Sequence, residues 1–123
     1  MRLILEREVQ SGNTFAYSHW KVRYRDKLAW ECCMHAALHL AKDRLGPPTG
    51  RRRVAFTAYR GRRLDDDNLV AGLKHARDQL VRFGLLTDDN AAGATFTYDQ
   101  QLVKSSPLGA GRPCLVIDIS EDA

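Results

Sequence analysis

The sequence predicts an α+β fold, a single small domain over residues 1–123 in which two helices pack on a mixed sheet, in the order β-α-β-α-β-β. Three observations predict it. Apolar residues recur with a period of 3.6 in two segments and with a period of two in others. Clusters of glycine, proline and serine separate these segments. A chain of 123 residues also has the length of one domain.

The first half of the chain predicts one strand and the longer helix. Residues 2–10 read as a strand, and 11–20 begin with turn residues and read as a loop or distorted hairpin. Residues 20–45 have the helical period, and Gly46-Pro47-Pro48 ends that helix. Its apolar residues recur at Leu28, Cys32, Ala36 and Leu40, and at Trp20, Tyr24, Ala37 and Ala41. We predict that Trp20, Trp30, Tyr17 and Tyr24 pack in the core rather than stack on bases.

The second half predicts three strands and one helix. Residues 52–60 alternate as a strand, and a helix follows over about 67–83 before Gly84 closes it. The apolar stripe of that helix comprises Leu69, Leu73, Ala76, Leu80 and Phe83. Residues 94–104 and 113–120 read as the last strands, and the Ser-Ser-Pro and glycines between them predict a hairpin.

Composition limits the classes of function. The chain carries a formal charge of +4 with a pI near 9.2, which is compatible with nucleic acid without being diagnostic. Its three cysteines match no zinc-site spacing and suit reduced thiols. No apolar run approaches the roughly 20 residues of a membrane span, and the N-terminus does not resemble a signal peptide. We therefore expect a cytoplasmic protein that does not bind membranes.

The run Asp65-Asp66-Asp67 is the strongest local signal for chemistry. A single aspartate, Asp67, suits the N-cap of the following helix, but three adjacent carboxylates exceed what a cap needs and repel one another unless a cation binds. In an extended segment Asp65 and Asp67 point the same way and can share one hard cation. A second acidic pair, Asp88-Asp89, follows the helix. About 25 Å of straight helix would separate the two clusters, so they meet only if the loop 84–90 folds back or a partner chain contributes.

Basic residues accompany the carboxylates. Six arginines fall within thirteen residues and are predicted to hold backbone phosphates: Arg51, Arg52, Arg53, Arg60, Arg62 and Arg63. Lys74 lies seven residues after Asp67, on the same helical face two turns away. A basic patch beside a carboxylate cage is what Mg²⁺-assisted hydrolysis of a phosphodiester requires. The alternative is that these charged residues are only solvated at the surface and that one aspartate caps the helix.

The segment from Asp65-Asp66-Asp67-Asn68-Leu69 through Lys74 and Asp78-Gln79-Leu80 to Gly84 and Asp88-Asp89 resembles the signature of RusA-type Holliday junction resolvases. The resemblance covers about residues 60–90. It implies a small homodimer that cleaves branched DNA with Mg²⁺, or with Mn²⁺ in its place. It also implies that Asp65, Asp67 and Asp89 hold the metal and act in catalysis, and that Lys74 is the positively charged catalytic partner. In this chain Lys74 follows the aspartate run about three residues later than in the family pattern. A non-catalytic nucleic-acid-binding protein of the same fold is the alternative.

Overall fold

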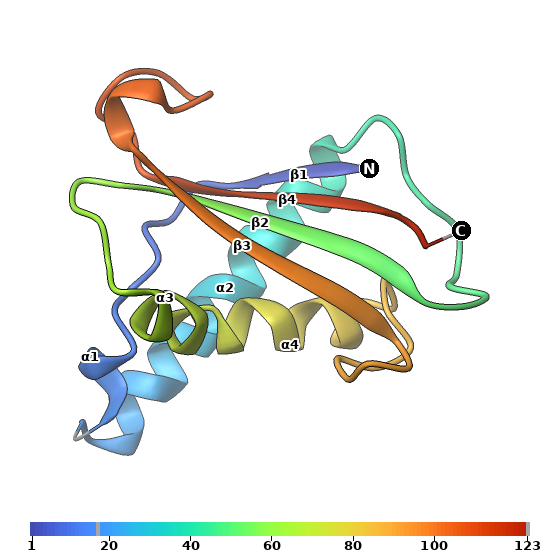
Figure 1. Ribbon diagram of the computed structural model, residues 1–123, viewed down its shortest axis with the longest axis horizontal. Helices are drawn as coiled ribbons and strands as arrows, with labels where there is room; N and C mark the ends of the chain where they lie inside the picture. The colour runs from blue at the N-terminus through green and yellow to red at the C-terminus, as the bar shows by residue number, and fades with distance from the viewer. Residues whose placement is uncertain (17, 123) are drawn as a thin grey trace.

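The computed structural model describes residues 1–16 and 18–122, and it has one four-stranded mixed sheet with helices packed on one of its faces (Figure 1). The α+β class predicted from the sequence is confirmed. No described helix is long and apolar enough to cross a membrane. The elements are β1 (Arg2–Leu5), α1 (Asn13–Ala16), α2 (Trp20–Leu40), β2 (Arg52–Arg60), α3 (Asp66–Gly72), α4 (Lys74–Arg82), β3 (Ala94–Leu102), the 3-10 turn η1 (Val103–Ser105) and β4 (Cys114–Glu121).

The sheet has the strand order β1-β4-β2-β3. Strands β2 and β3 are parallel, whereas β4 runs antiparallel to both β2 and β1. The predicted hairpin between the last two strands is therefore wrong, because β2 lies between them. The burial of β4 gives the reason. Residues 114–117 are all buried, which suits a central strand, whereas the exposed threonines of β3 suit an edge.

The core lies between the helices and the face of the sheet that they cover. Strand β2 has the bounds that its alternation predicts, with Val54, Phe56 and Ala58 pointing inward. Leu3, Leu5, Leu115, Ile117 and Ile119 join them from the neighbouring strands. The opposing helices contribute Trp30, Met34, Leu69, Leu73, Ala76 and Leu80.

Helix α2 buries a different face from the one that its apolar spacing suggested. Its buried residues are Asp26, Trp30, Met34, Ala37 and Leu38. The steps predicted to be apolar and inward, at Leu28, Cys32, Ala36 and Leu40, are exposed. Trp30 is buried as predicted, whereas Trp20 and Tyr24 are 57% and 53% exposed, so the prediction that they pack in the core is wrong; Tyr17 lies outside the described residues.

The segment between β1 and α2 leaves the sheet early and packs along α3. The predicted strand 2–10 stops at Leu5, although Val9 is fully buried, and the predicted loop 11–20 contains the short helix α1. The amide of Gly12 donates to the carbonyl of Asn68 at 3.0 Å. The predicted helix 20–45 also ends sooner, since Ala41 turns to an extended conformation with ψ 130°.

The predicted helix 67–83 is interrupted at Leu73, which separates α3 from α4. Its apolar stripe is nonetheless buried as expected at Leu69, Leu73, Ala76 and Leu80. Gly72 explains the tight packing at the interruption: a Cβ atom there would lie 1.9 Å from the carbonyl oxygen of Gln10. Because the helix is broken, the expectation that Asp67 and Lys74 share one continuous helical face no longer holds.

Candidate functional site

The three carboxylates of the aspartate run lie at the start of α3, immediately after the loop that leaves β2. Asp65 has the N-cap position with φ −61° and ψ 148°, but its side chain makes no capping hydrogen bond. Asp66 and Asp67 occupy the first helical turn, so the prediction of Asp67 as the N-cap is wrong by two residues. All three side chains are exposed. Within residues 1–16 and 18–122, no lysine, arginine or histidine forms an ion pair with them.

The side chain of Gln100 fixes the position of this run against the sheet. Its amide accepts a hydrogen bond from the N–H of Leu64 at 2.8 Å and donates to the Leu64 carbonyl at 2.7 Å. Gln100 is 3% exposed and lies near the carboxyl end of β3, parallel to the end of β2. The carboxyl ends of parallel strands are a usual place for binding sites in α/β units. Sequence reasoning missed Gln100, although a glutamine at an inward position of an alternating strand is a detectable signal.

Asp89 lies beside α4 because the loop after that helix folds back. The amides of Leu85 and Leu86 both donate to the carbonyl of Leu80, which reverses the chain. Arg77 then donates to the carbonyl of Asp89 at 3.2 Å, and its Nη2 lies 3.8 Å from the Asp89 carboxylate. The loop 84–90 therefore folds back, which is one of the two ways in which the acidic clusters could meet. It brings Asp89 to Arg77, three residues or about 4.5 Å beyond Lys74 along the helix.

Arg77 is a residue that sequence reasoning missed. Besides contacting Asp89, it donates to the hydroxyl of Tyr98 at 2.9 Å, and its guanidinium carbon lies 4.4 Å from the centre of the Phe96 ring. These contacts tie the Asp89 loop to β3. Lys74, by contrast, is exposed at the first position of α4.

No three carboxylate, histidine or cysteine side chains gather around one point within the described residues. The predicted trio is thus separated: Asp65 and Asp67 lie at the head of α3, and Asp89 lies beside Arg77. Only Asp65 is extended and Asp67 is helical, so the expectation that the two point the same way from an extended segment is wrong. Carboxylate oxygens still suit Mg²⁺ or Mn²⁺. Mg²⁺ commonly takes only one or two protein carboxylates and completes its shell with water and substrate phosphate. The donor set at the head of α3 fits that mode of binding.

The six arginines form two groups rather than one patch. Strand β2 separates them over nine residues, or roughly 30 Å at about 3.3 Å per residue. At its start Arg52 is 1% exposed and donates to the carbonyls of Leu85 and Gly46, at 2.7 and 2.6 Å. Arg51 and Arg53 both bind the carboxylate of Asp122, whose pKa these hydrogen bonds lower. Arg52 is therefore unavailable to DNA, while Arg51 and Arg53 are exposed but paired with Asp122.

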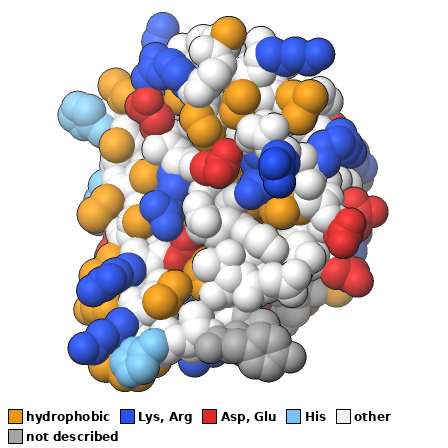
Figure 2. Space-filling model, turned by 90° about the vertical axis from the view of Figure 1, so that its left-hand side faces the viewer, with side chains coloured by type: hydrophobic (Ala, Val, Ile, Leu, Met, Phe, Trp, Pro, Cys, Tyr) orange, Lys and Arg blue, Asp and Glu red, His pale blue; other side chains and the backbone are white. Residues whose placement is uncertain are grey.

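The second arginine group lies beside the aspartate run. Arg60 is half-buried and donates to the carbonyls of Val9 and Arg62. Arg62 and Arg63 are exposed, and Arg63 reaches the carbonyl of Gln100 at 3.3 Å. Figure 2 shows basic and acidic side chains interspersed on this end of the molecule. Of the six predicted phosphate contacts, Arg62 and Arg63 are the two that are both exposed and adjacent to the carboxylates.

Cys33 and Cys114 are poor candidates for nucleophiles. Burial raises the pKa of the thiols of Cys33 and Cys114, which keeps them protonated at neutral pH. Cys114 also lies 3.6 Å from the hydroxyl of Ser106.

Comparison with models of protein families, with curated proteins and with solved structures finds no match to the chain.

Proposed function

We propose that this protein is a Mg²⁺-dependent endonuclease that acts on branched DNA such as four-way junctions, in the cytoplasm. One observation carries the proposal: three adjacent carboxylates are exposed at the head of α3, and none of them forms an ion pair with the residues that the structure describes, while Arg62 and Arg63 lie in the loop just before them. Such repulsion is relieved by a bound divalent ion. The resemblance of residues 60–90 to RusA-type resolvases supports the same function.

Each of the site residues has a separate role in the proposed hydrolysis. Asp65 and Asp67 would hold Mg²⁺, which supplies polarisation of the scissile phosphate and a more acidic water. Arg62 and Arg63 bind the flanking phosphates through their planar guanidinium groups. Lys74 offsets negative charge that develops on the phosphate oxygens. Asp89 would join Asp65 and Asp67 if DNA binding moves the loop after α4 toward the head of α3. This movement requires the Asp89 carboxylate to leave Arg77.

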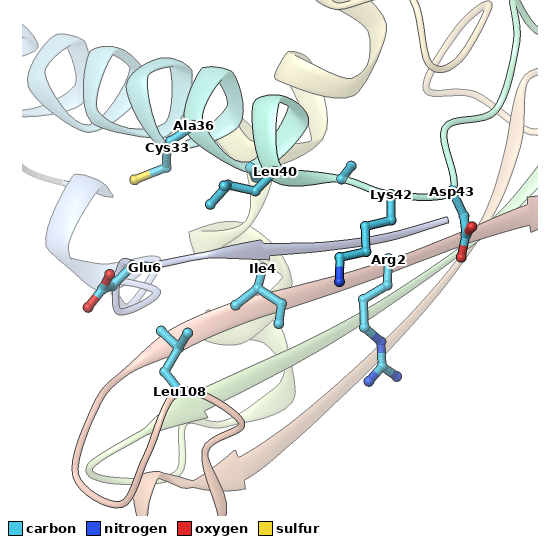
Figure 3. Close-up of a pocket in the computed structure, with 11 residues that line it drawn as sticks. Arg2, Ile4, Glu6, Cys33, Ala36, Leu40, Lys42, Asp43 and Leu108 are labelled. Carbon is cyan, nitrogen blue, oxygen red and sulfur yellow. The ribbon is translucent and has the colours of Figure 1, made fainter.

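The same proposal includes a homodimer, and the edge of the sheet supports it. At this edge Met1 and Ile119 exchange backbone hydrogen bonds at 2.8 Å. Because such pairs alternate in an antiparallel ladder, the backbone groups of Arg2 and Ile4 face the free edge of β1. A groove of about 490 Å³ runs beside this edge. Figure 3 shows Leu40 of α2 on one side of it and Ile4 and Leu108 on the other.

A second copy of the chain is the proposed occupant of this edge, where Arg2 and Glu6 bind Asp118 and Arg112 within a single copy and would exchange these partners in the dimer. Arg2, Ile4 and Glu6 lie along β1 and its extension and line the groove. If two β1 strands pair antiparallel about Ile4, Arg2 of one copy faces Glu6 of the other, and two such pairs form around a two-fold axis. Leu40 is 75% exposed, so Leu40→Glu should leave the fold intact and yield a monomer in light-scattering measurements. Leu28→Glu, on the same helix outside the groove, is the control and should stay dimeric. A monomeric mass for the parent protein as well as for both variants would exclude this dimer.

Cleavage of labelled DNA tests the enzymatic proposal. A four-way junction and a linear duplex of the same sequence are incubated with the protein in Mg²⁺ or in EDTA. We expect cleavage of the junction in Mg²⁺ alone and little cleavage of the duplex. Junction binding without cleavage in Mg²⁺ and in Mn²⁺ would favour the non-catalytic DNA-binding alternative, which the separation of Asp89 from Asp65 and Asp67 also favours.

A further inference from the structure

The first two turns of α2 expose aromatic rings that the core does not use. Trp20 and Tyr24 are 57% and 53% exposed and lie one turn apart on a ridge of the helix. Their rings meet edge to face at 6.3 Å and 62°, so neither ring covers the face of the other. The His19 ring and the Lys21 ammonium lie 5.5 and 6.0 Å from the centre of the Trp20 ring, and a base that stacks on Trp20 would displace one of them. Large aromatic surface left exposed in this way is typical of a binding site.

Positive charge surrounds this aromatic ridge. Lys21, Arg23, Arg25 and Lys27 are all exposed. At 100° per residue, Arg23 and Lys27 lie on one side of the ridge and Lys21 and Arg25 on the other. In the described part of the chain, none of the four forms an ion pair.

The one acidic residue within these two turns, Asp26, faces inward. It is 3% exposed and binds Arg7 at 2.9 Å and the His75 ring at 2.8 Å. Its charge is therefore matched inside the protein, and the outer surface of these two turns remains cationic. Strong positive potential favours an anionic partner.

The ridge lies at the same end of the molecule as the aspartate run. Through Asp26 and His75, the first turns of α2 contact the first turn of α4, one residue after Lys74. The amide of Gly12, close before α1, binds the carbonyl of Asn68 in α3. Figures 1 and 2 agree: α2 begins at the lower part of this end, where basic and hydrophobic side chains lie together.

We propose that the segment Trp20–Lys27 binds unpaired nucleotides of the DNA substrate. Trp20 and Tyr24 stack on exposed bases, and the four flanking cations bind the phosphates on either side. Single-stranded DNA fits better than duplex because stacking on an aromatic ring needs a free base face, which paired and stacked bases do not offer. The inference rests on the proposed function for its choice of a DNA ligand, and it adds a second contact surface outside the aspartate run.

Binding in EDTA tests the inference without any contribution from cleavage. Fluorescence anisotropy measures the affinity of the full chain for labelled oligo-dT and for a duplex of the same length. We expect the double variant Trp20→Ala, Tyr24→Ala to lose at least about tenfold in affinity for oligo-dT. His39→Ala, which removes an exposed ring at the other end of α2, should bind like the parent protein. Thermal melting of each variant verifies that the fold is retained.

The salt dependence gives an independent readout. Arg23→Gln with Lys27→Gln should reduce the slope of log affinity against log salt by about 1.4, because each single-strand phosphate contributes about 0.7. Equal affinity of the parent and the aromatic double variant for oligo-dT would overturn the inference. Binding of the protein to vesicles of anionic phospholipid but not to oligo-dT would also overturn the inference. If oligo-dT binds as expected but junctions are never cleaved, the inference stands and the proposed enzymatic function fails.

Discussion

Replacing Arg52 by methionine should destabilise the protein without weakening its affinity for DNA. The sequence placed this arginine among the phosphate contacts, but its side chain is 1% exposed. It donates to the carbonyl of Leu85 at 2.7 Å and to that of Gly46 at 2.6 Å. Methionine keeps most of the apolar stem and removes both donors.

The magnitude follows from those two bonds. A hydrogen bond from a charged donor contributes about 1.5–3 kcal/mol, so losing two costs roughly 3–6 kcal/mol. Relief of the cost of burying a guanidinium works in the opposite direction. The pair with Glu121, whose side chain is 52% exposed, adds less than about 1 kcal/mol. We expect a net loss of about 3 kcal/mol in the free energy of unfolding.

Urea denaturation followed by circular dichroism measures this loss, and anisotropy with duplex DNA measures affinity. Arg62→Met is the matched control: it changes an exposed arginine, should shift stability by no more than about 0.5 kcal/mol, and should flatten the salt dependence of binding by about one unit. The reasoning is refuted if Arg52→Met unfolds within about 1 kcal/mol of the parent protein while its affinity for DNA falls.

Three further predictions concern stability and reactivity. Gly72→Ala should cost at least about 2 kcal/mol in denaturation experiments, because its Cβ would lie 1.9 Å from the Gln10 carbonyl oxygen and the backbone would have to move. Iodoacetamide at neutral pH, followed by mass spectrometry, should label exposed Cys32 before Cys33, since burial raises the pKa of the Cys33 thiol. Asp122→Asn should lose a contribution to stability that is complete above pH 3.8 and fades as the pH falls below it, because hydrogen bonds from arginine lower the pKa of this carboxyl in the folded state.

Each of these has its own control. Gly50→Ala has nothing within 4 Å of the new Cβ atom and should unfold like the parent protein, so equal stability of Gly72→Ala and Gly50→Ala would contradict the close approach. Labelling of Cys33 as fast as Cys32 would contradict its burial. For Asp122→Asn, a difference from the parent protein that persists unchanged down to pH 2 would show that the carboxylate charge is not its source.

Local patterns predicted the elements well where a single buried face decides them. Strand β2 alternates because one face meets the helices, and its bounds 52–60 were predicted directly. The same alternation marks Arg52 as an inward residue, in phase with Val54 and Phe56, while Arg53 points outward. The alternation alone therefore predicts that Arg52 is buried, although its place in a cluster of arginines suggested a contact with phosphate.

Pairing between distant segments was not predictable from local patterns. The turn residues between β3 and β4 favour a hairpin, but they do not record that the buried residues 114–117 suit a strand with neighbours on both edges. Helix α2 poses a similar problem, since it carries apolar residues on two faces. Which one the sheet covers depends on partners such as Arg7 and His75, which bind Asp26 and fix the rotation of the helix.

The candidate site was predicted in part. The head of α3 does carry the exposed aspartate run, and Arg62 and Arg63 accompany it. The position of Asp89 depends on Arg77, a contact between a helix and the loop after it that no spacing rule supplies.

Single-turnover cleavage of a four-way junction in Mg²⁺ by Asp67→Asn and Asp66→Asn tests the proposed function most directly. Both variants lose one charge from the same exposed run and keep a residue that suits a helix N-terminus. If Asp65 and Asp67 hold the metal, Asp67→Asn should lose cleavage by orders of magnitude while binding the junction as before, and Asp66→Asn should cleave like the parent protein. Equal rates for the parent and both variants would contradict the account.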